Sequence, residues 1–283
     1  MSIRGSTRVL GVFGDPVAHS LSPAMHTRFA EESGEDSVYV PFHVLPENLE
    51  TALHALPSLG IRGVNITVPH KESTFRLVSE HTDAARAMGA VNTVIVDGER
   101  LIGDNTDGAG FAADLEAHFD HTGWGKGPVV VLGAGGAARA VVHALTVAGV
   151  PEVVVANRTL ETGQALIGQL APETGRAVAL PSEELQNALP RARLLVNTTS
   201  VGLKGETFPG LSLDALPREA GVYDLIYNPA RTPLLQEAEQ QGLAVANGLG
   251  MLVRQGAISY ARWTGKEPRV EPVIEWLEGQ LGN

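Results

Sequence analysis

Residues 129–139 read VVVLGAGGAAR. The four apolar residues at the start, three of them β-branched, predict a strand that is buried on both faces. Glycines follow at once, and the alanine-rich run after them predicts a helix. Gly133 permits the sharp turn, Gly135 lets a ligand approach the backbone, and the small Ala138 lets the helix pack on the strand. N–H groups at the start of this helix would bind phosphates, so the segment indicates a dinucleotide-binding turn.

The next predicted strand distinguishes between the two common dinucleotides. It covers residues 153–156 and ends in Asn157, Arg158 and Thr159. NAD-binding proteins have a carboxylate here for the ribose 2′-hydroxyl, whereas this chain has an arginine, which can bind a 2′-phosphate. The residues therefore favour NADP. Two alternatives stay open, namely that Arg158 is a solvated charge at a strand end and that the glycines form a plain turn between strand and helix.

Composition restricts the class of protein. With 283 residues, 43% of them hydrophobic, the chain is expected to form one or two globular domains. The net charge of −11 gives no electrostatic attraction for a nucleic acid, and local donors must therefore bind any anionic substrate. The absence of cysteine excludes disulfides, thiolate metal sites and a thiol nucleophile. No apolar run approaches the roughly 18 residues of a membrane span and the N-terminus carries no apolar signal core, so we expect a cytoplasmic protein without a membrane partner.

Two serines near the N-terminus can be interpreted in two ways. Ser20 and Ser22 precede Pro23, which suits the first turn of a helix after the predicted strand 8–14. Ser22 can therefore be the N-cap of that helix. Alternatively, both serines direct their hydroxyl groups at a small anion.

Three polar residues surround the end of another predicted strand. Asn65 and Thr67 alternate with apolar residues over 63–68, which places both side chains on one face. Pro69 ends the strand, and Lys71 lies just beyond it. Because ligands of open parallel sheets bind beyond the carboxyl ends of strands, we expect these side chains to converge on a small polar molecule. The alternative for Lys71 is a solvated lysine that opens a helix.

Two further polar residues have both a structural and a ligand-binding interpretation. Asn92 lies within a predicted strand, 89–96, that is otherwise apolar. A buried amide needs hydrogen-bond partners, so Asn92 either ties loops together or meets a ligand. Asp107 precedes a helix predicted over 109–119, where it or Thr106 can act as the N-cap.

Strands and helices alternate along the whole chain, which predicts an α/β protein. Further strands are expected to begin at Leu194 and Gly221 and to cover 244–248, and a helix is expected over 249–263. We predict two domains. Residues 1–105, completed by 249–283, form one α/β domain, and residues 106–248 form a Rossmann-like nucleotide-binding domain with a parallel sheet.

Several motifs together resemble those of the shikimate dehydrogenase family, in order and spacing, over nearly the whole chain. They cover residues 14–23, 65–71, 89–93, 105–108, 133–137, 157–159, 197–202 and 247–255. The resemblance implies that the first domain binds substrate and that the second binds NADP. It also implies the reversible, NADP-dependent reduction of 3-dehydroshikimate to shikimate, a step towards the aromatic amino acids.

The resemblance further implies roles for individual residues. Lys71 and Asp107 would form the catalytic pair at the C3 oxygen, with Lys71 as base in oxidation and acid in reduction. The substrate carboxylate would be bound by Ser20, Ser22 and Tyr227, and the remainder of the substrate by Asn65, Thr67, Lys71, Asn92, Asp107 and Gln255. The cofactor would be held by Gly133, Ala134, Gly135, Gly136, Ala137, Asn157, Arg158 and Thr159, with Thr199, Leu225 and Gly248 near the nicotinamide. No metal is implied, and no His, Asp or Glu cluster with ligand spacing demands one.

The chain also departs from the family pattern at two positions. Thr27 stands where an asparagine is common, and Thr162 stands where many NADP-dependent members have a second arginine. The second departure weakens the argument for strict NADP selectivity without reversing it.

Other functions stay open on the sequence. An NAD-dependent quinate/shikimate dehydrogenase is the main alternative, although the paired serines favour shikimate and Arg158 argues against NAD. A non-catalytic NADP-binding sensor would have no need of Lys71 and Asp107. An aminoshikimate or methylene-tetrahydrofolate dehydrogenase is a third possibility, and the serine motif argues against the folate enzyme. The chain is expected to be a monomer or a homodimer.

Overall fold

The structure, a computed structural model, describes residues 3–282, without the side chains of residues 121 and 122. Residues 1, 2 and 283 of the predicted first domain lie outside this range. The chain forms two compact units. The first holds the residues up to Thr106 together with Val253–Leu277, and the second holds Asp107–Leu252 together with the residues from Glu278 on. The units thus divide at 106/107, 252/253 and 277/278.

The first unit contains a mixed sheet whose strands follow the order β2-β1-β3-β5-β6-β4. These strands are β1 (Arg8–Gly14), β2 (Ser37–His43), β3 (Ile61–Ile66), β4 (Glu80–His81), β5 (Thr93–Asp97) and β6 (Arg100–Asp104). Strands β1, β2 and β3 run parallel, whereas β5 is antiparallel to both β3 and β6. A tight turn at Gly98, with φ of 62°, joins β5 to β6. The beginning of β5 therefore lies beside the ends of β3 and β6.

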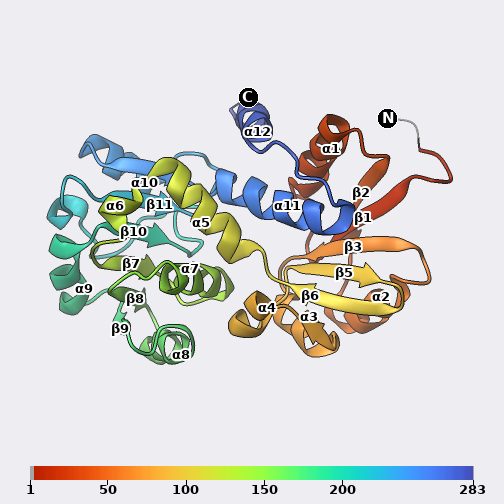
Figure 1. Cartoon of the computed structure of the whole chain (residues 1–283). Helices are drawn as coiled ribbons and strands as arrows, with labels where there is room; N and C mark the ends of the chain where they lie inside the picture. The colour runs from red at the N-terminus through yellow and green to blue at the C-terminus, as the bar shows by residue number, and fades with distance from the viewer. Residues whose placement is uncertain (1–2, 283) are drawn as a thin grey trace. The chain divides into compact units, whose positions relative to one another are not determined.

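Helices cover both faces of this sheet (Figure 1). They are α1 (Ser22–Ser33), α2 (Leu49–Ala55), α3 (Lys71–Leu77), α4 (Asp83–Met88) and α11 (Leu249–Thr264, from Val253 on), with a 3₁₀ turn at Pro46–Asn48. The part of α12 (Glu271–Leu281) up to Leu277 packs on α1 instead, where Arg28 lies over the Trp276 ring. In β3, Val64 and Ile66 belong to the apolar cluster that includes α2. Gly63 faces α11 instead, because a Cβ at this position would overlap Trp263. Side chains alternate between the faces of a strand, so Asn65 also faces α11.

The second unit contains a parallel sheet with the strand order β12-β11-β10-β7-β8-β9. These strands are β7 (Val129–Leu132), β8 (Val153–Asn157), β9 (Gly175–Ala179), β10 (Leu194–Asn197), β11 (Gly221–Asp224) and β12 (Ala244–Asn247). The chain reverses direction across the sheet between β7 and β10, which is the arrangement of a Rossmann fold. The α/β class and the Rossmann-like second sheet, both predicted from the sequence, are confirmed.

Helices cover both faces of the second sheet as well (Figure 1). They are α5 (Asp107–His118), α6 (His121–Trp124), α7 (Gly136–Val147), α8 (Leu160–Leu170), α9 (Glu183–Ala188) and α10 (Pro233–Gln240), with 3₁₀ turns at Leu189–Arg191 and Leu213–Ala215. One core lies between the sheet and helices α5, α7 and α8, and another lies between the sheet and helices α9 and α10. All four residues of β7 are fully buried, which explains their uniformly apolar character.

Candidate active site

The two predicted substrate-binding serines lie at the start of α1. The Ser20 Oγ accepts a hydrogen bond of 3.2 Å from the N–H of Ser22. Ser22 is the first residue of the helix, and the N-cap is Leu21, which makes no side-chain hydrogen bond. Of the two interpretations of Ser22, the N-cap is therefore wrong, because the helix already includes this residue. Its hydroxyl lies beside Tyr39 instead, where it opposes the burial that raises the pKa of the phenol.

Asn65 is held by hydrogen bonds on both sides of its amide. It is 7% exposed and lies one residue before the end of β3. Its Oδ1 accepts from the Tyr39 hydroxyl at 2.8 Å. Its Nδ2 donates to Asn92 O at 3.2 Å, to Thr93 Oγ1 at 3.2 Å and to Ser259 Oγ at 3.0 Å. This network fixes the orientation of the Asn65 amide.

Asn92 connects the loop before β5 to the loop after β6. It precedes β5, whereas the sequence predicts it inside a strand, because Gly89 ends α4 with φ of 59° and the chain becomes extended only at Thr93. The Asn92 Nδ2 donates to Thr106 Oγ1 at 2.9 Å and to Gln255 Oε1 at 3.2 Å. Its Oδ1 accepts from the N–H of Thr106 at 2.9 Å. Asn92 therefore ties two loops together and also contacts another predicted substrate-binding residue.

Three predicted substrate-binding amides thus gather in the first unit, and we call Asn65, Asn92 and Gln255 the amide cluster. They come from the end of β3, the loop before β5 and helix α11. The antiparallel pairing of β3 with β5 sets Asn65 opposite Thr93, and the N–H of Ile66 donates to Asn92 O at 2.7 Å. The direction of β5 is therefore what brings the cluster together.

Two residues that hold the amide cluster, Tyr39 and Ser259, are not among those predicted from the sequence. Ser259 lies four residues after Gln255 on α11, a spacing that places both on one helix face and was a usable signal. Tyr39 lies in β2, on the far side of β1 from Asn65, and no local pattern connects it to that residue.

Thr67 and Lys71 follow the end of β3. The N–H of Thr67 donates to Phe13 O at 2.9 Å, which ties the segment to β1. Lys71 is the first residue of α3 and is half-buried, so it does open a helix, as the alternative interpretation has it. The Lys71 carbonyl accepts from the N–H of Val91 at 3.0 Å. Since Val91 precedes Asn92, this bond joins the start of α3 to the loop of the amide cluster.

Asp107 is the first residue of α5 and of the second unit, and it is half-buried. It directly follows Thr106, whose backbone and side chain bind Asn92. Its partner in the predicted catalytic pair, Lys71, belongs to the first unit.

The glycine turn joins β7 to α7 in the second unit. Gly133 has φ of 101°, and a Cβ there would lie 2.7 Å from Thr199 Cγ2. Gly135 is the N-cap of α7, with no side-chain hydrogen bond, and a Cβ on Gly135 or Gly136 would meet no described atom within 4 Å. Ala134 packs against the core, Ala137 is exposed and the fully buried Ala138 belongs to the core. The helix N-terminus is therefore open to an approaching anion on its glycine side.

The end of β8 carries the residues predicted to select the cofactor. Asn157 is the last residue of the strand, and its Nδ2 donates to Thr159 O at 2.8 Å. Thr159 is the N-cap of α8. Arg158 is exposed and forms no ion pair with any other described residue, so its guanidinium is available to a ligand.

Hydrogen bonds organise the loops after β10 and β11. Thr199 donates to Asn197 Oδ1 from its N–H at 2.9 Å and from its hydroxyl at 2.8 Å. The Asn197 Nδ2 donates to Asp224 Oδ1 at 2.9 Å, and the Thr232 hydroxyl donates to Asp224 Oδ2 at 2.7 Å. Burial raises the pKa of Asp224, and these hydrogen bonds oppose the shift. The buried Asp224 thus fixes both loops.

Leu225, Tyr227 and Gly248 lie beyond these strand ends. A Cβ on Gly248 would overlap the Leu225 carbonyl oxygen, so only glycine fits there without a shift of the backbone. Burial raises the pKa of the Tyr227 phenol, which therefore keeps its proton at neutral pH and can act as a hydrogen-bond donor.

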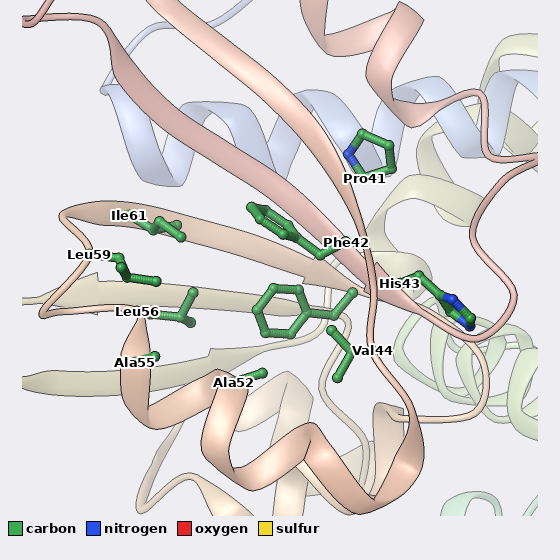
Figure 2. A pocket seen from close by; sticks show the side chains of 10 residues that line it. Pro41, Phe42, His43, Val44, Ala52, Ala55, Leu56, Leu59 and Ile61 are labelled. Atoms are coloured by element: carbon green, nitrogen blue, oxygen red, sulfur yellow. The ribbon is translucent and has the colours of Figure 1, made fainter.

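A separate apolar pocket of about 340 Å³ lies in the first unit between β2 and α2 (Figure 2). Its lining includes Phe42, Ala52, Leu56 and Leu59, with His43 at one end. None of the predicted site residues lines it. The pocket is therefore distinct from the amide cluster.

The described part of the chain holds neither a cluster of metal ligands nor a helix that could cross a membrane. Among the side chains that the structure describes, no three His, Asp or Glu residues gather in a way that could hold a metal ion. No helix in this part of the chain combines the length and the apolar character that a membrane span needs.

Comparisons with known proteins identify the family of this chain. Residues 12–94 match the family model for the shikimate dehydrogenase substrate binding domain, residues 116–203 match shikimate/quinate 5-dehydrogenase, and residues 248–277 match the shikimate 5′-dehydrogenase C-terminal domain. A shikimate dehydrogenase (NADP(+)) from Geobacter metallireducens is 46% identical over 272 residues, which is 95% of each chain. The chain belongs to the shikimate dehydrogenase family.

Solved structures of the family have the same fold. Shikimate 5-dehydrogenase from Listeria monocytogenes, in complex with shikimate and NAD, has a TM-score of 0.91 at 34% identity and covers 98% of each chain. The Thermus thermophilus enzyme, in complex with NADP(H) and shikimate, has a TM-score of 0.86 at 40% identity over 97% of this chain and 100% of its own. The family resemblance inferred from the sequence motifs is confirmed.

Proposed function

We propose that this chain catalyses the reversible, NADP-dependent reduction of 3-dehydroshikimate to shikimate, in the pathway to the aromatic amino acids. The observation that carries the proposal is the amide cluster, in a chain that belongs to this family. The hydrogen bond from the N–H of Val91 to the carbonyl of Lys71 connects this cluster to the start of helix α3. A polyhydroxylated ring needs several fixed amide donors and acceptors, and this cluster supplies them. A cytoplasmic setting is part of the proposal, since the reaction draws on the NADP(H) pool of metabolism.

The substrate is bound through its hydroxyl and carboxylate groups. The amide cluster, with Thr67 and Asp107, binds the ring hydroxyls. Ser20, Ser22 and the neutral phenol of Tyr227 donate hydrogen bonds to the carboxylate. Hydrogen bonds to a charged group contribute about 1.5–3 kcal/mol each, which compensates for the acidic net charge of the chain.

Lys71 and Asp107 move the proton. In shikimate oxidation, Lys71 takes the proton from the C3 hydroxyl, and in reduction it returns a proton to the same oxygen. Asp107 orients the ammonium group and shares the proton. The cofactor, when bound by the second unit, would supply the hydride chemistry at C3, as NADP+ for oxidation and as NADPH for reduction.

The second unit holds the cofactor. The space beside Gly135 and Gly136 and the open N-terminus of α7 fit a pyrophosphate, since neither glycine has a described atom where its Cβ would lie. The remaining residues of the turn, Gly133, Ala134 and Ala137, lie next to the pyrophosphate in this proposal. Asn157, Arg158 and Thr159 hold the adenosine end, and Arg158 binds the 2′-phosphate. Thr199, Leu225 and Gly248 border the nicotinamide.

Initial rates with four substrate pairs test the proposal. Shikimate and quinate are each measured with NADP and with NAD. The pair of shikimate and NADP is expected to give the highest kcat/KM, because the chain has paired serines and Arg158. A higher kcat/KM for quinate with NAD would favour the quinate/shikimate dehydrogenase alternative, and no turnover of either substrate would favour a non-catalytic NADP-binding protein.

A further inference from the structure

Ser259 lies at the centre of the polar network in the first unit. It is fully buried on α11, one turn after Gln255. Its Oγ accepts from Asn65 Nδ2 at 3.0 Å and donates to Gln255 O at 3.1 Å. It also lies 2.7 Å from Thr93 Oγ1 and 3.2 Å from Thr106 Oγ1. One hydroxyl therefore touches the supports of all three amides in the cluster.

The contacts of Ser259 help to hold the amides in one orientation. The Asn92 carbonyl oxygen can only accept, so it sets the Nδ2 side of Asn65. Ser259, whose proton goes to Gln255 O, accepts from the same Nδ2, and Tyr39 donates to Oδ1. Thr106, the neighbour of Ser259, also fixes the Asn92 amide through its Oγ1 and its N–H. An alanine at position 259 would remove one of the three acceptors around Asn65 Nδ2 and also the hydroxyl that lies between Thr93 and Thr106, which would hold the amides less firmly.

We propose that Ser259 is a positioning residue that aligns the amide cluster for recognition of the ring hydroxyls remote from C3. It is too deeply buried to touch the substrate, and it acts through Asn65 and Thr106. The inference rests on the proposed function, because it assumes that the cluster binds the hydroxyls of shikimate.

The test compares Ser259→Ala with Ser33→Ala. Ser33 makes a 2.7 Å hydrogen bond with the hydroxyl of Tyr260, the residue after Ser259, and so joins α1 to α11 without touching the cluster. The control therefore removes a support of the same helix. For each variant we would measure kcat and KM with shikimate, with 4-deoxyshikimate and with 5-deoxyshikimate, together with KM for NADP and the melting temperature.

Ser259→Ala is expected to lower kcat/KM for shikimate about tenfold, mainly through KM, and to lower it less than twofold for at least one deoxy analogue. A deoxy analogue lacks the ring hydroxyl that the misaligned amide would bind, so its kcat/KM depends less on the position of that amide. KM for NADP is expected to stay unchanged, and Ser33→Ala is expected to keep kcat/KM for shikimate within twofold. Ser259→Cys, which keeps the size but weakens the hydrogen bonds, is expected to show a smaller loss of the same kind and serves if the alanine variant does not fold.

Equal losses with shikimate and both analogues would overturn the positioning role, as would equal losses in Ser259→Ala and Ser33→Ala. The parent protein is assayed first. If it turns over shikimate, either of these outcomes removes only the role of Ser259. If it does not, the proposed function falls, and the role of Ser259 falls with it.

Discussion

The polar side chains that are completely buried act as supports in this chain, whereas the ligand-binding candidates keep some exposed surface. Ser259, Thr93 and Asp224 are fully buried and are bound by other residues of the protein. Lys71 and Arg158 keep part of their surface exposed, at the start of a helix and at the end of a strand. A support can act only through its neighbours, whereas a partly exposed cation can contact a ligand directly.

Lys71→Met is expected to lower kcat for shikimate oxidation by about 10²–10⁴-fold, because the variant lacks the amine that takes the C3 proton. KM for shikimate should change much less, since several other groups hold the ring. Steady-state kinetics would check this. The matched control is Arg76→Met, which removes an exposed positive charge from the same helix and should keep the parent kcat. A Lys71→Met protein that folds and turns over at the parent rate would contradict the proposed proton transfer.

His26 links stability to pH. It stacks on Tyr39, with ring centroids 4.0 Å apart, and burial lowers its pKa to about 3, against a smaller raising effect of Asn65. An unfolded histidine has a pKa of about 6.5, so below that pH the unfolded chain binds a proton that the folded chain does not. This contribution to stability is complete above pH 6.5 and is lost as the pH falls towards 3.

The size of that effect is measurable with His26→Phe, which keeps an aromatic ring but cannot take a proton. Between about pH 6 and 5, the free energy of unfolding of the parent should fall more steeply than that of the variant, by up to about 1.4 kcal/mol per pH unit. Urea denaturation at each pH would give both slopes. Parallel slopes would show that the unfolding of this chain is not linked to His26.

At the scale of elements, two glycines, Gly248 and Gly135, have opposite surroundings. One is packed tightly between two loops, and the other has open space beside a helix. A Cβ on Gly248 would overlap the Leu225 carbonyl, so the loops after β11 and β12 pack against each other. A Cβ on Gly135 would meet no described atom within 4 Å, although the residue caps a twelve-residue helix. The first glycine serves packing, and the second leaves room beside the N–H groups of α7.

Gly248→Ala and Gly135→Ala form a matched pair that tests this difference. Gly248→Ala should lose about 1–3 kcal/mol of stability, because the backbone of Leu225 must move. Gly135 has φ of −85°, which alanine adopts, so Gly135→Ala should keep the parent stability and weaken NADP binding. Thermal unfolding and NADP titration of both variants would check this. A Gly135→Ala protein that binds NADP as tightly as the parent would exclude a pyrophosphate site beside this residue.

At the scale of the whole molecule, the net charge of −11 opposes the binding of anions such as shikimate and NADP. Affinity must therefore come from donors at fixed places, namely the serines, the N-terminus of α7 and Arg158. A ligand that binds only the folded state raises the free energy of unfolding. The loss of this increase in a variant therefore measures how much the substituted donor contributes to binding.

NADP at a hundred times its Kd should stabilise the protein by about 2.7 kcal/mol, seen as a rise in melting temperature. In Arg158→Ala the same NADP concentration should give a smaller rise, because the guanidinium that binds the 2′-phosphate is missing. The rise with NAD should be the same in the variant and the parent. A variant that loses the effect of both cofactors equally would show that Arg158 supports the fold and does not select the cofactor.

Much of the fold and part of the candidate site follow from local sequence patterns. The buried strand β7, the glycine turn and helix α7 agree with their prediction, because apolar runs, glycines and helix formers act through neighbours a few residues apart. Strand β1 begins and ends where the sequence predicts, for the same reason. The hairpin of β5 and β6 was missed, although Asp97 and Gly98 carry the local signal for a tight turn.

Only the tertiary structure decided how the polar residues meet. Asn65 and Gln255 are far apart in sequence, and their meeting at Asn92 depends on the antiparallel direction of β5, which a strand pattern does not contain. The cap role expected for Ser22 failed because the start of α1 was shifted by one residue, and the roles of Tyr39 and Ser259 needed the packing of β2 and α11. Neighbouring residues decide which helices and strands form. The direction of a strand within its sheet and the packing of side chains depend on contacts between distant segments, and these contacts form only when the chain folds.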